Sequence, residues 1–274
     1  MSDDPGVRPS DTDRPTTAEN AADASGGAAA DADATADPDT PVNGLVRLAL
    51  AAFAVVFALL VASAVTNPVS SLAVSFGVVS EGTNAFQILQ TVVQFGGFLL
   101  ATLGYLALTS EWGLLRLDRP SAREGGLIVT AAIGLLALQY SALFVLAEIG
   151  VTTGQNVAVV PAGDPATYYL AMIVVSILVV GPVEEFLFRG VVQGGLRRAF
   201  DAAPAILLAS LIFGLIHFPA VAGTDIERLA YVGVVIGLGC VLGYLYERTD
   251  NILIPGLAHG LYNAAIYAVL WAGV

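Results

Sequence analysis

Seven apolar stretches, each long enough to cross a lipid bilayer, constrain this chain more than any other feature of its sequence. A transmembrane helix needs about 20 consecutive, mostly apolar residues. Charged residues make up only 12% of the chain and hydrophobic residues 56%, which excludes an ordinary soluble domain. We expect an all-α protein, a polytopic membrane helix bundle of about seven transmembrane helices. We place these helices at residues 44–66, 84–108, 125–148, 167–196, 204–222, 228–246 and 251–272, and residues 69–80 could add a short re-entrant segment.

Residues 1–41 differ in composition from the rest of the chain. They hold ten acidic residues against Arg8 and Arg14, and almost no large apolar side chain. Such a segment buries too little surface to offset the entropy lost on ordering. It also lacks the basic start and apolar core of a signal peptide. We therefore expect a disordered acidic tail at residues 1–41, followed by a transmembrane helical domain at residues 42–274.

The distribution of arginine predicts how the bundle sits in the membrane. The connections between stretches alternate between those that contain arginine and those that do not, since residues 67–83, 149–166 and 218–227 contain none. The arginines of the other side are Arg47, Arg116, Arg119, Arg123, Arg197, Arg198 and Arg248. Because basic residues favour the cytoplasmic side, we expect an integral membrane protein, in the cell membrane, with its N-terminus in the cytoplasm.

Glycines recur in two of the stretches at spacings that suit close helix packing. Small residues four apart allow helices to approach each other closely in lipid. We interpret this set as packing positions: Gly190, Gly194, Gly233, Gly237, Gly239 and Gly243.

Strongly polar side chains are rare inside the apolar stretches, and they occur at similar depths. Such residues are functional candidates because they are expensive to bury in a bilayer. At about 1.5 Å per residue, Glu184 and His217 lie about 20 Å from the arginine-rich ends of their helices. On the same scale His259 lies about 12 Å and Asn263 about 18 Å from that end. We expect these groups to share one hydrated cavity, reached from the cytoplasm.

Helical spacing suggests a role for each group. Glu185 and Arg189 lie four residues apart, with the acid first, which favours a structural ion pair. Glu184 points about 100° away from Glu185 and is left to act as a general base on water, which an imidazole would help to hold. His259 and Asn263 are also four apart and share a helix face. This pair could donate hydrogen bonds to a developing oxyanion.

A metal ion is a second way to use the same side chains. Glu184, His217 and His259 are three ligands of the kinds that zinc accepts, with one position left for water. The H-E-x-x-H zinc signature is absent from the sequence. The residues alone leave the cofactor open, with Zn2+ as the candidate.

Three short motifs give the chain a family resemblance. They read EEFLFR from Glu184 to Arg189, FGLIH from Phe213 to His217, and HGLYN from His259 to Asn263. In this order they resemble the pattern E-E-x-x-x-R, F-x-x-x-H, H-x-x-x-N of the CAAX prenyl protease and bacteriocin-processing (CPBP) intramembrane proteases. The similarity covers residues 167–272, which we expect to form the protease core.

The resemblance implies an all-helical endopeptidase, of metalloprotease or glutamate type, with its active site below the cytoplasmic surface. It implies that Glu184 activates water together with His217, and that His259 and Asn263 stabilise the oxyanion. Glu185 and Arg189 would support the site. Phe213 would pack beside it.

The expected partners are the lipid bilayer and a membrane-bound or lipid-modified protein substrate, possibly prenylated; no nucleic-acid partner is expected. A non-catalytic membrane scaffold of the same family is one alternative to an enzyme. A proton-coupled transporter is another, because buried Glu and His side chains also serve as proton relays. Such carriers often contain repeated halves with paired broken helices, and we find no such repeat in the sequence.

Overall fold

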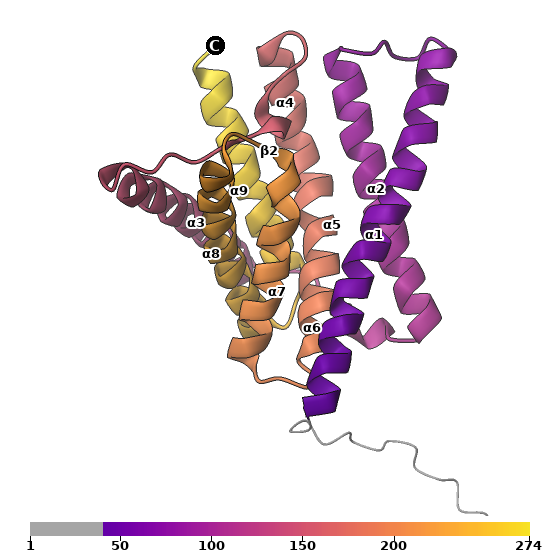
Figure 1. Ribbon diagram of the computed structural model, residues 1–274, viewed down its shortest axis with the longest axis vertical. Coiled ribbons are helices and arrows are strands. Elements are labelled where there is room, and N and C mark those ends of the chain that lie inside the picture. The colour runs from indigo at the N-terminus through magenta and orange to yellow at the C-terminus, as the bar shows by residue number, and fades with distance from the viewer. Residues whose placement is uncertain (1–40) are drawn as a thin grey trace, which may run out of the picture. The chain divides into compact units, whose positions relative to one another are not determined.

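The computed structural model describes residues 41–274, which form a helical bundle (Figure 1). Seven helices in this part of the chain are long and apolar enough to cross a membrane, as the sequence predicts. They run over Asn43–Ser75, Asn84–Thr109, Ala122–Glu148, Pro165–Leu196, Ala202–Ala220, Asp225–Thr249 and Leu253–Ala272. The predicted acidic tail lies outside the described residues, apart from Pro41 at the start of the first helix.

Helix α1 (Pro41–Ser75) is longer than predicted, and α2 (Asn84–Thr109) packs against it. The prediction that residues 69–80 could form a re-entrant segment is wrong, because α1 continues through Pro68 to Ser75. Proline removes one backbone hydrogen bond from a helix interior, but membrane helices tolerate it where neighbouring groups satisfy the backbone. The chain after Pro68 therefore extends the first span.

Capping side chains fix where several helices begin. Ser121 and Glu124 form a capping box at the start of α3 (Ala122–Glu148), and Thr224 and Glu227 form another at the start of α8 (Asp225–Thr249). Asp164 caps α4 (Pro165–Val175). Hydrogen bonds from the side chain and the backbone N–H of Thr167 hold the pKa of the Asp164 carboxyl below its usual value. These caps satisfy N–H groups that the first helical turn leaves without partners.

The fourth span is one continuous helix that contains two π-helical segments. After α4 come a π-helical segment η3 (Ser176–Val180), α5 (Gly181–Glu185), a second π-helical segment η4 (Phe186–Gln193) and α6 (Gly194–Leu196). Pro182 cannot donate a backbone hydrogen bond and would clash with the carbonyl one turn earlier, which explains the wider winding of η3. Such π segments are frequent at functional sites, and here they flank Glu184 and Glu185.

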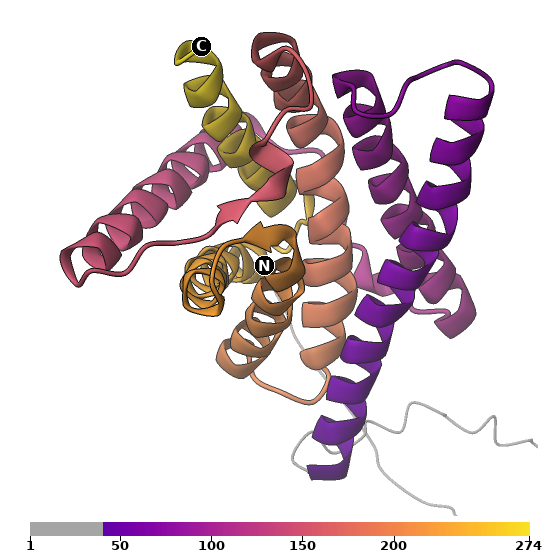
Figure 2. The same ribbon diagram turned by 45° about the horizontal axis from the view of Figure 1, so that its top comes forward.

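A small antiparallel β pair ties two connections together at the end of the bundle where the C-terminus lies (Figure 1). Strand β1 (Gln155–Asn156) pairs with β2 (Val221–Ala222). In Figure 2, α3 leans away from the other helices. The connection that contains β1 leads from the end of α3 back to the bundle. The pair thus joins the connection before α4 to the one between α7 (Ala202–His217) and α8.

Candidate active site

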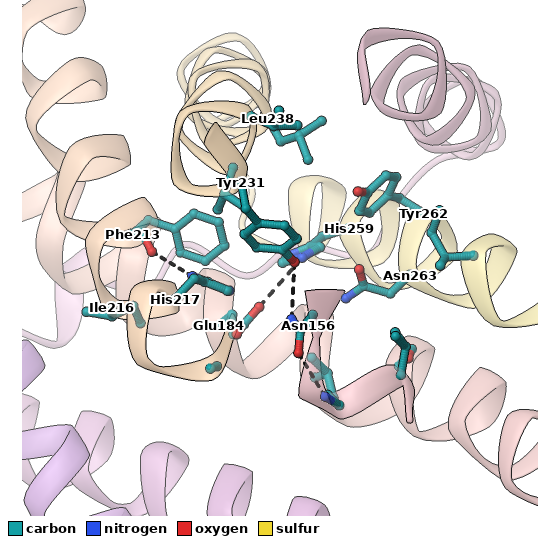
Figure 3. Close-up of a pocket in the computed structure, with 18 of the residues that line it drawn as sticks. Asn156, Glu184, Phe213, Ile216, His217, Tyr231, Leu238, His259, Tyr262 and Asn263 are labelled. Carbon is teal, nitrogen blue, oxygen red and sulfur yellow. Dashed lines mark hydrogen bonds and ion pairs between the residues drawn. The ribbon is translucent and has the colours of Figure 1, made fainter. Parts of the chain in front are cut away.

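The three motifs meet at one cavity of about 460 Å³ inside the bundle (Figure 3). Glu184 reaches its wall from α5, His217 from the C-terminal end of α7, and His259 and Asn263 from α9 (Leu253–Ala272). The four catalytic candidates predicted from the sequence therefore line the same space. Three separate helices hold them there.

Glycines bring α9 close enough to the fourth span for these contacts. A Cβ atom added to Gly260 would lie 2.7 Å from the carbonyl oxygen of Ser176 and 2.8 Å from Cα of Ile177. One added to Gly256 would lie 3.1 Å from Cα of Pro182. Two glycines four apart are a known means of close helix contact in lipid. They seat His259, which lies between them, against the adjacent glutamates.

His259 bridges both carboxylates of the first motif. Its Nδ1 lies 3.0 Å from Oε1 of Glu185, and its Nε2 lies 3.6 Å from Oε2 of Glu184. The first distance is a hydrogen bond and the second is longer than one. The sequence predicts that Glu184 and Glu185 point in different directions, but it does not predict that one imidazole ring can face both.

Glu185 is held by a buried hydrogen-bonded chain that leads away from the cavity. Arg189 Nε donates to Glu185 Oε2 at 2.7 Å, and neither side chain is exposed. Arg189 Nη1 donates to Gln193 Oε1 at 3.3 Å, and Gln193 Nε2 donates to Glu247 Oε1 at 3.0 Å. Glu247 in turn pairs with Arg197 at 3.3 Å. The chain runs from the imidazole of His259 to the arginine-rich end of the bundle, and it balances the negative charge of Glu185.

His217 presents one ring nitrogen to the cavity. Its Nδ1 lies 2.7 Å from the carbonyl oxygen of Phe213, and since a carbonyl can only accept, Nδ1 carries the proton. In the neutral ring Nε2 is then an acceptor. The Phe213 ring packs edge-on against both His217 and His259, with ring centroids 4.7 Å and 5.9 Å away. Phe213 thus separates the two imidazoles and limits how each can turn.

Glu184 is the carboxylate that faces the cavity. Its side chain is 13% exposed, whereas that of Glu185 is fully buried. No arginine, lysine or backbone N–H is hydrogen-bonded to it among the described residues. A carboxylate with free acceptor positions beside an imidazole can take a proton from water.

The cavity has further polar side chains that the sequence does not predict. Tyr231 of α8 accepts a hydrogen bond from Asn156 Nδ2 at 3.1 Å (Figure 3). Tyr262 of α9 donates to Gln139 of α3. Tyr262 lies within the third motif, at a position that the pattern H-x-x-x-N leaves free, and the other three residues lie outside the motifs. A tyrosine or glutamine in an apolar helix carries no signal of its own.

The side chains that could bind a metal ion are of the right chemical kinds, but they do not lie close enough together to bind one ion. Both imidazoles use Nδ1 for a hydrogen bond and leave Nε2 towards the cavity, as metal-binding histidines commonly do. In residues 41–274, however, no three His, Cys, Asp or Glu side chains lie close enough to hold one ion together. The predicted set of Glu184, His217 and His259 does not fit Zn2+ as arranged, and we derive no step through a metal.

The cavity extends to the arginine-free end of the bundle. Residues of the connection that contains β1, from Thr153 to Val159, line it together with Ala220, and none of its lining residues comes from the connections 110–121, 197–201 or 250–252. His217 is the last residue of α7, directly before this end. The sequence predicts access from the arginine-rich side, and the residues that line the cavity differ from that prediction.

Comparison with known proteins agrees with the three motifs. Residues 166–265, which contain all of them, match the family described as type II CAAX prenyl endopeptidase Rce1-like. Residues 166–265 thus resemble the Rce1-like family. A protein of Bacillus subtilis (strain 168) named "Putative membrane peptidase YdiL" is 33% identical to this chain over 96 residues. That match covers 35% of this chain and 35% of the relative, so the chain spans about a third of the curated relative's length. No solved structure matches the chain.

The Rce1-like segment supplies the motif residues of the cavity, whereas α1, α2, α3 and the connection that contains β1 supply other parts of its wall. It begins in α4 and ends in α9 two residues after Asn263. The predicted resemblance to the CAAX prenyl protease family is therefore confirmed for the segment that carries the candidate site.

Proposed function

We propose that this protein is an intramembrane endopeptidase that hydrolyses peptide bonds of membrane-associated proteins. The observation that carries the proposal is the position of Glu184. Its carboxylate lies on the wall of a cavity inside the bundle, 3.6 Å from an imidazole nitrogen, within an Rce1-like segment. A general base, a site for water and amide donors in one cavity are the parts that peptide hydrolysis requires.

The proposed reaction begins with a water molecule between Glu184 and Nε2 of His217. Glu184 takes a proton from this water while the water oxygen bonds to the carbonyl carbon of the peptide. The carbonyl π electrons move to the carbonyl oxygen, which becomes the oxyanion. Asn263 donates a hydrogen bond to that oxyanion. Glu184 then returns the proton to the amide nitrogen, the C–N bond breaks, and an amine and a carboxylic acid leave. His259 positions Glu184 throughout.

The proposed substrate is a membrane-bound or lipid-modified protein, including a prenylated one. Two features of the cavity support this class. Much of its wall comes from helices that are long and apolar enough to cross a membrane, and apolar side chains such as Phe95, Leu143 and Val235 make up much of the lining. A hydrophobic chain attached to a peptide can lie among them, because apolar surface removed from water contributes about 25 cal/mol per Å².

The test is cleavage of a prenylated C-terminal peptide by the purified protein in lipid. Glu184→Gln should lower kcat by about 100- to 10,000-fold, because it removes a general base, and it should leave peptide binding intact. Glu148→Gln is the matched control, since Glu148 is exposed at the end of α3 and does not line the cavity. Unchanged cleavage in Glu184→Gln would remove Glu184 as the base. A scaffold would bind the peptide without cleaving it, and a carrier would instead show pH-dependent flux.

A further inference from the structure

The motifs supply few hydrogen-bond donors for the oxyanion formed during hydrolysis. Nδ1 of His259 is hydrogen-bonded to Glu185, and its Nε2 faces Glu184 at 3.6 Å, which is longer than a hydrogen bond. His259 is thus turned towards the two carboxylates, and Asn263 is the other donor of the predicted pair. A further residue of the cavity wall can add a donor to this pair.

Tyr231 has the chemistry and the position to be that donor. Its hydroxyl oxygen accepts a hydrogen bond from Asn156 Nδ2, so that bond does not use the hydroxyl proton. No other hydrogen bond within residues 41–274 takes this proton. Tyr231 lines the same cavity as Glu184, His259 and Asn263, and Figure 3 shows its hydroxyl pointing into that cavity above Asn156.

Asn156 is itself fixed, so the phenol has a defined orientation. The backbone of Asn156 pairs with Val221 across the β pair, and its Oδ1 accepts a hydrogen bond from the backbone N–H of Ala158 at 2.9 Å. With Oδ1 occupied, Nδ2 must point the other way, towards Tyr231. A donor fixed before the reaction loses no free energy to reorganisation when charge develops.

We propose that Tyr231 is a further catalytic residue, whose O–H donates a hydrogen bond to the oxyanion of the tetrahedral intermediate, and that Asn156 is the residue that positions it. The inference rests on the proposed peptidase function. The phenol keeps its proton throughout. As the carbonyl π electrons move to the carbonyl oxygen, the phenol O–H of Tyr231 donates a hydrogen bond to that oxygen, next to the amide of Asn263. This hydrogen bond is released when the C–N bond breaks.

The test compares Tyr231→Phe with Tyr168→Phe in the peptide cleavage assay. Tyr168 is a matched control, because it is also a buried phenol, its hydroxyl donates to the carbonyl of Ala158 in the same connection, and it does not line the cavity. Removing one oxyanion donor typically lowers kcat by about 100- to 1,000-fold. Tyr231→Phe should show a loss of that size with KM unchanged, and Tyr168→Phe should keep the wild-type kcat. Wild-type kcat in Tyr231→Phe, or equal losses in both variants, would overturn the proposal.

Asn156→Ala tests the positioning role. It should lower kcat less than Tyr231→Phe does, because the phenol remains but is no longer oriented. In a Tyr231→Phe background it should have no further effect on kcat, since both changes remove one interaction. Fully additive losses would show that Asn156 acts through something other than the phenol.

A binding measurement makes the inference independent of turnover. A peptide with a hydrated fluoroketone in place of the cleaved bond resembles the tetrahedral intermediate, and such analogues bind about 100-fold or more tighter than substrates. Tyr231→Phe should weaken this analogue while leaving the affinity for the uncleaved peptide unchanged. Equal affinity of wild type and Tyr231→Phe for the analogue would reject the donor role. Glu184→Gln separates the two proposals, because its activity reports on the peptidase function and not on Tyr231.

Discussion

The Nδ1 atom of His259 lies 3.0 Å from Oε1 of Glu185, the same carboxylate whose other oxygen accepts a hydrogen bond from Arg189. One of two adjacent glutamates is thereby neutralised by a guanidinium and used to orient an imidazole. The other, Glu184, keeps its acceptor positions for the cavity. The two carboxylates of the first motif thus have different tasks, because only one of them has a cationic partner.

Replacing Glu185 by Gln should destabilise the protein strongly. The change leaves the guanidinium of Arg189 buried without its counter-charge, and breaking a buried ion pair from one side costs about 3–5 kcal/mol. The double variant Glu185→Gln, Arg189→Met should lose much less, because no charge is then left unpaired. The free energy of unfolding in mixed detergent micelles measures both effects. A double variant as unstable as the single one would contradict a role in charge balance.

Glycine packing gives a second prediction about the site. Gly260→Ala should destabilise the bundle by about 1–3 kcal/mol, as overpacking commonly does, because the new methyl group meets backbone atoms of η3 that cannot move aside. It should also reduce cleavage, since separating α9 from the fourth span moves His259 away from Glu184. Gly233→Ala is the control, because a Cβ atom there meets nothing within 4 Å. If both variants had the same stability and activity, close helix contact would not be what seats His259.

The spans and the residues of the cavity could be predicted from this sequence because their signals are local. Apolar runs of spanning length fixed the number of helices, and the rarity of polar residues in those runs singled out Glu184, His217 and His259. Helical rise then placed them at one depth. The sequence could not show that α1 continues past Pro68. A proline often marks the end of a helix in a sequence, but a membrane span tolerates it.

The contacts that depend on how helices approach each other were beyond the sequence. Gly239 would meet the side chain of Ser210 if it carried a Cβ atom, as the packing interpretation expects, whereas Gly233 faces open space and that interpretation is wrong for it. Gly256 and Gly260, which bring His259 against two carboxylates, were not singled out. The place of Tyr231 in the cavity likewise depends on Asn156, 75 residues earlier in the chain.

Chelation tests whether a metal takes part. Because no three ligands approach one point within residues 41–274, we expect cleavage to persist after treatment with a strong chelator and to remain dependent on Glu184. The assay compares treated and untreated protein on the same peptide, with the chelator removed before substrate is added. Loss of cleavage that Zn2+ restores would instead mean that Glu184, His217 and His259 close around an ion.

Cysteine labelling tests from which side the cavity is entered. In a Cys240→Ser background, which removes the single native cysteine, Thr153→Cys places a thiol on the cavity wall at the arginine-free end, and Arg119→Cys places one at the arginine-rich end. We expect a bulky maleimide on Thr153→Cys to block cleavage, and the same label on Arg119→Cys to leave it unchanged.

The same variants report orientation. Because arginine-rich connections favour the cytoplasm, a membrane-impermeant maleimide should label Thr153→Cys in intact cells and Arg119→Cys only in inverted vesicles. The reverse pattern would place the arginine-rich end outside. Block by the label at Arg119→Cys, with none at Thr153→Cys, would show that substrate enters between the arginine-rich ends of the helices, as the sequence predicts and the cavity lining does not.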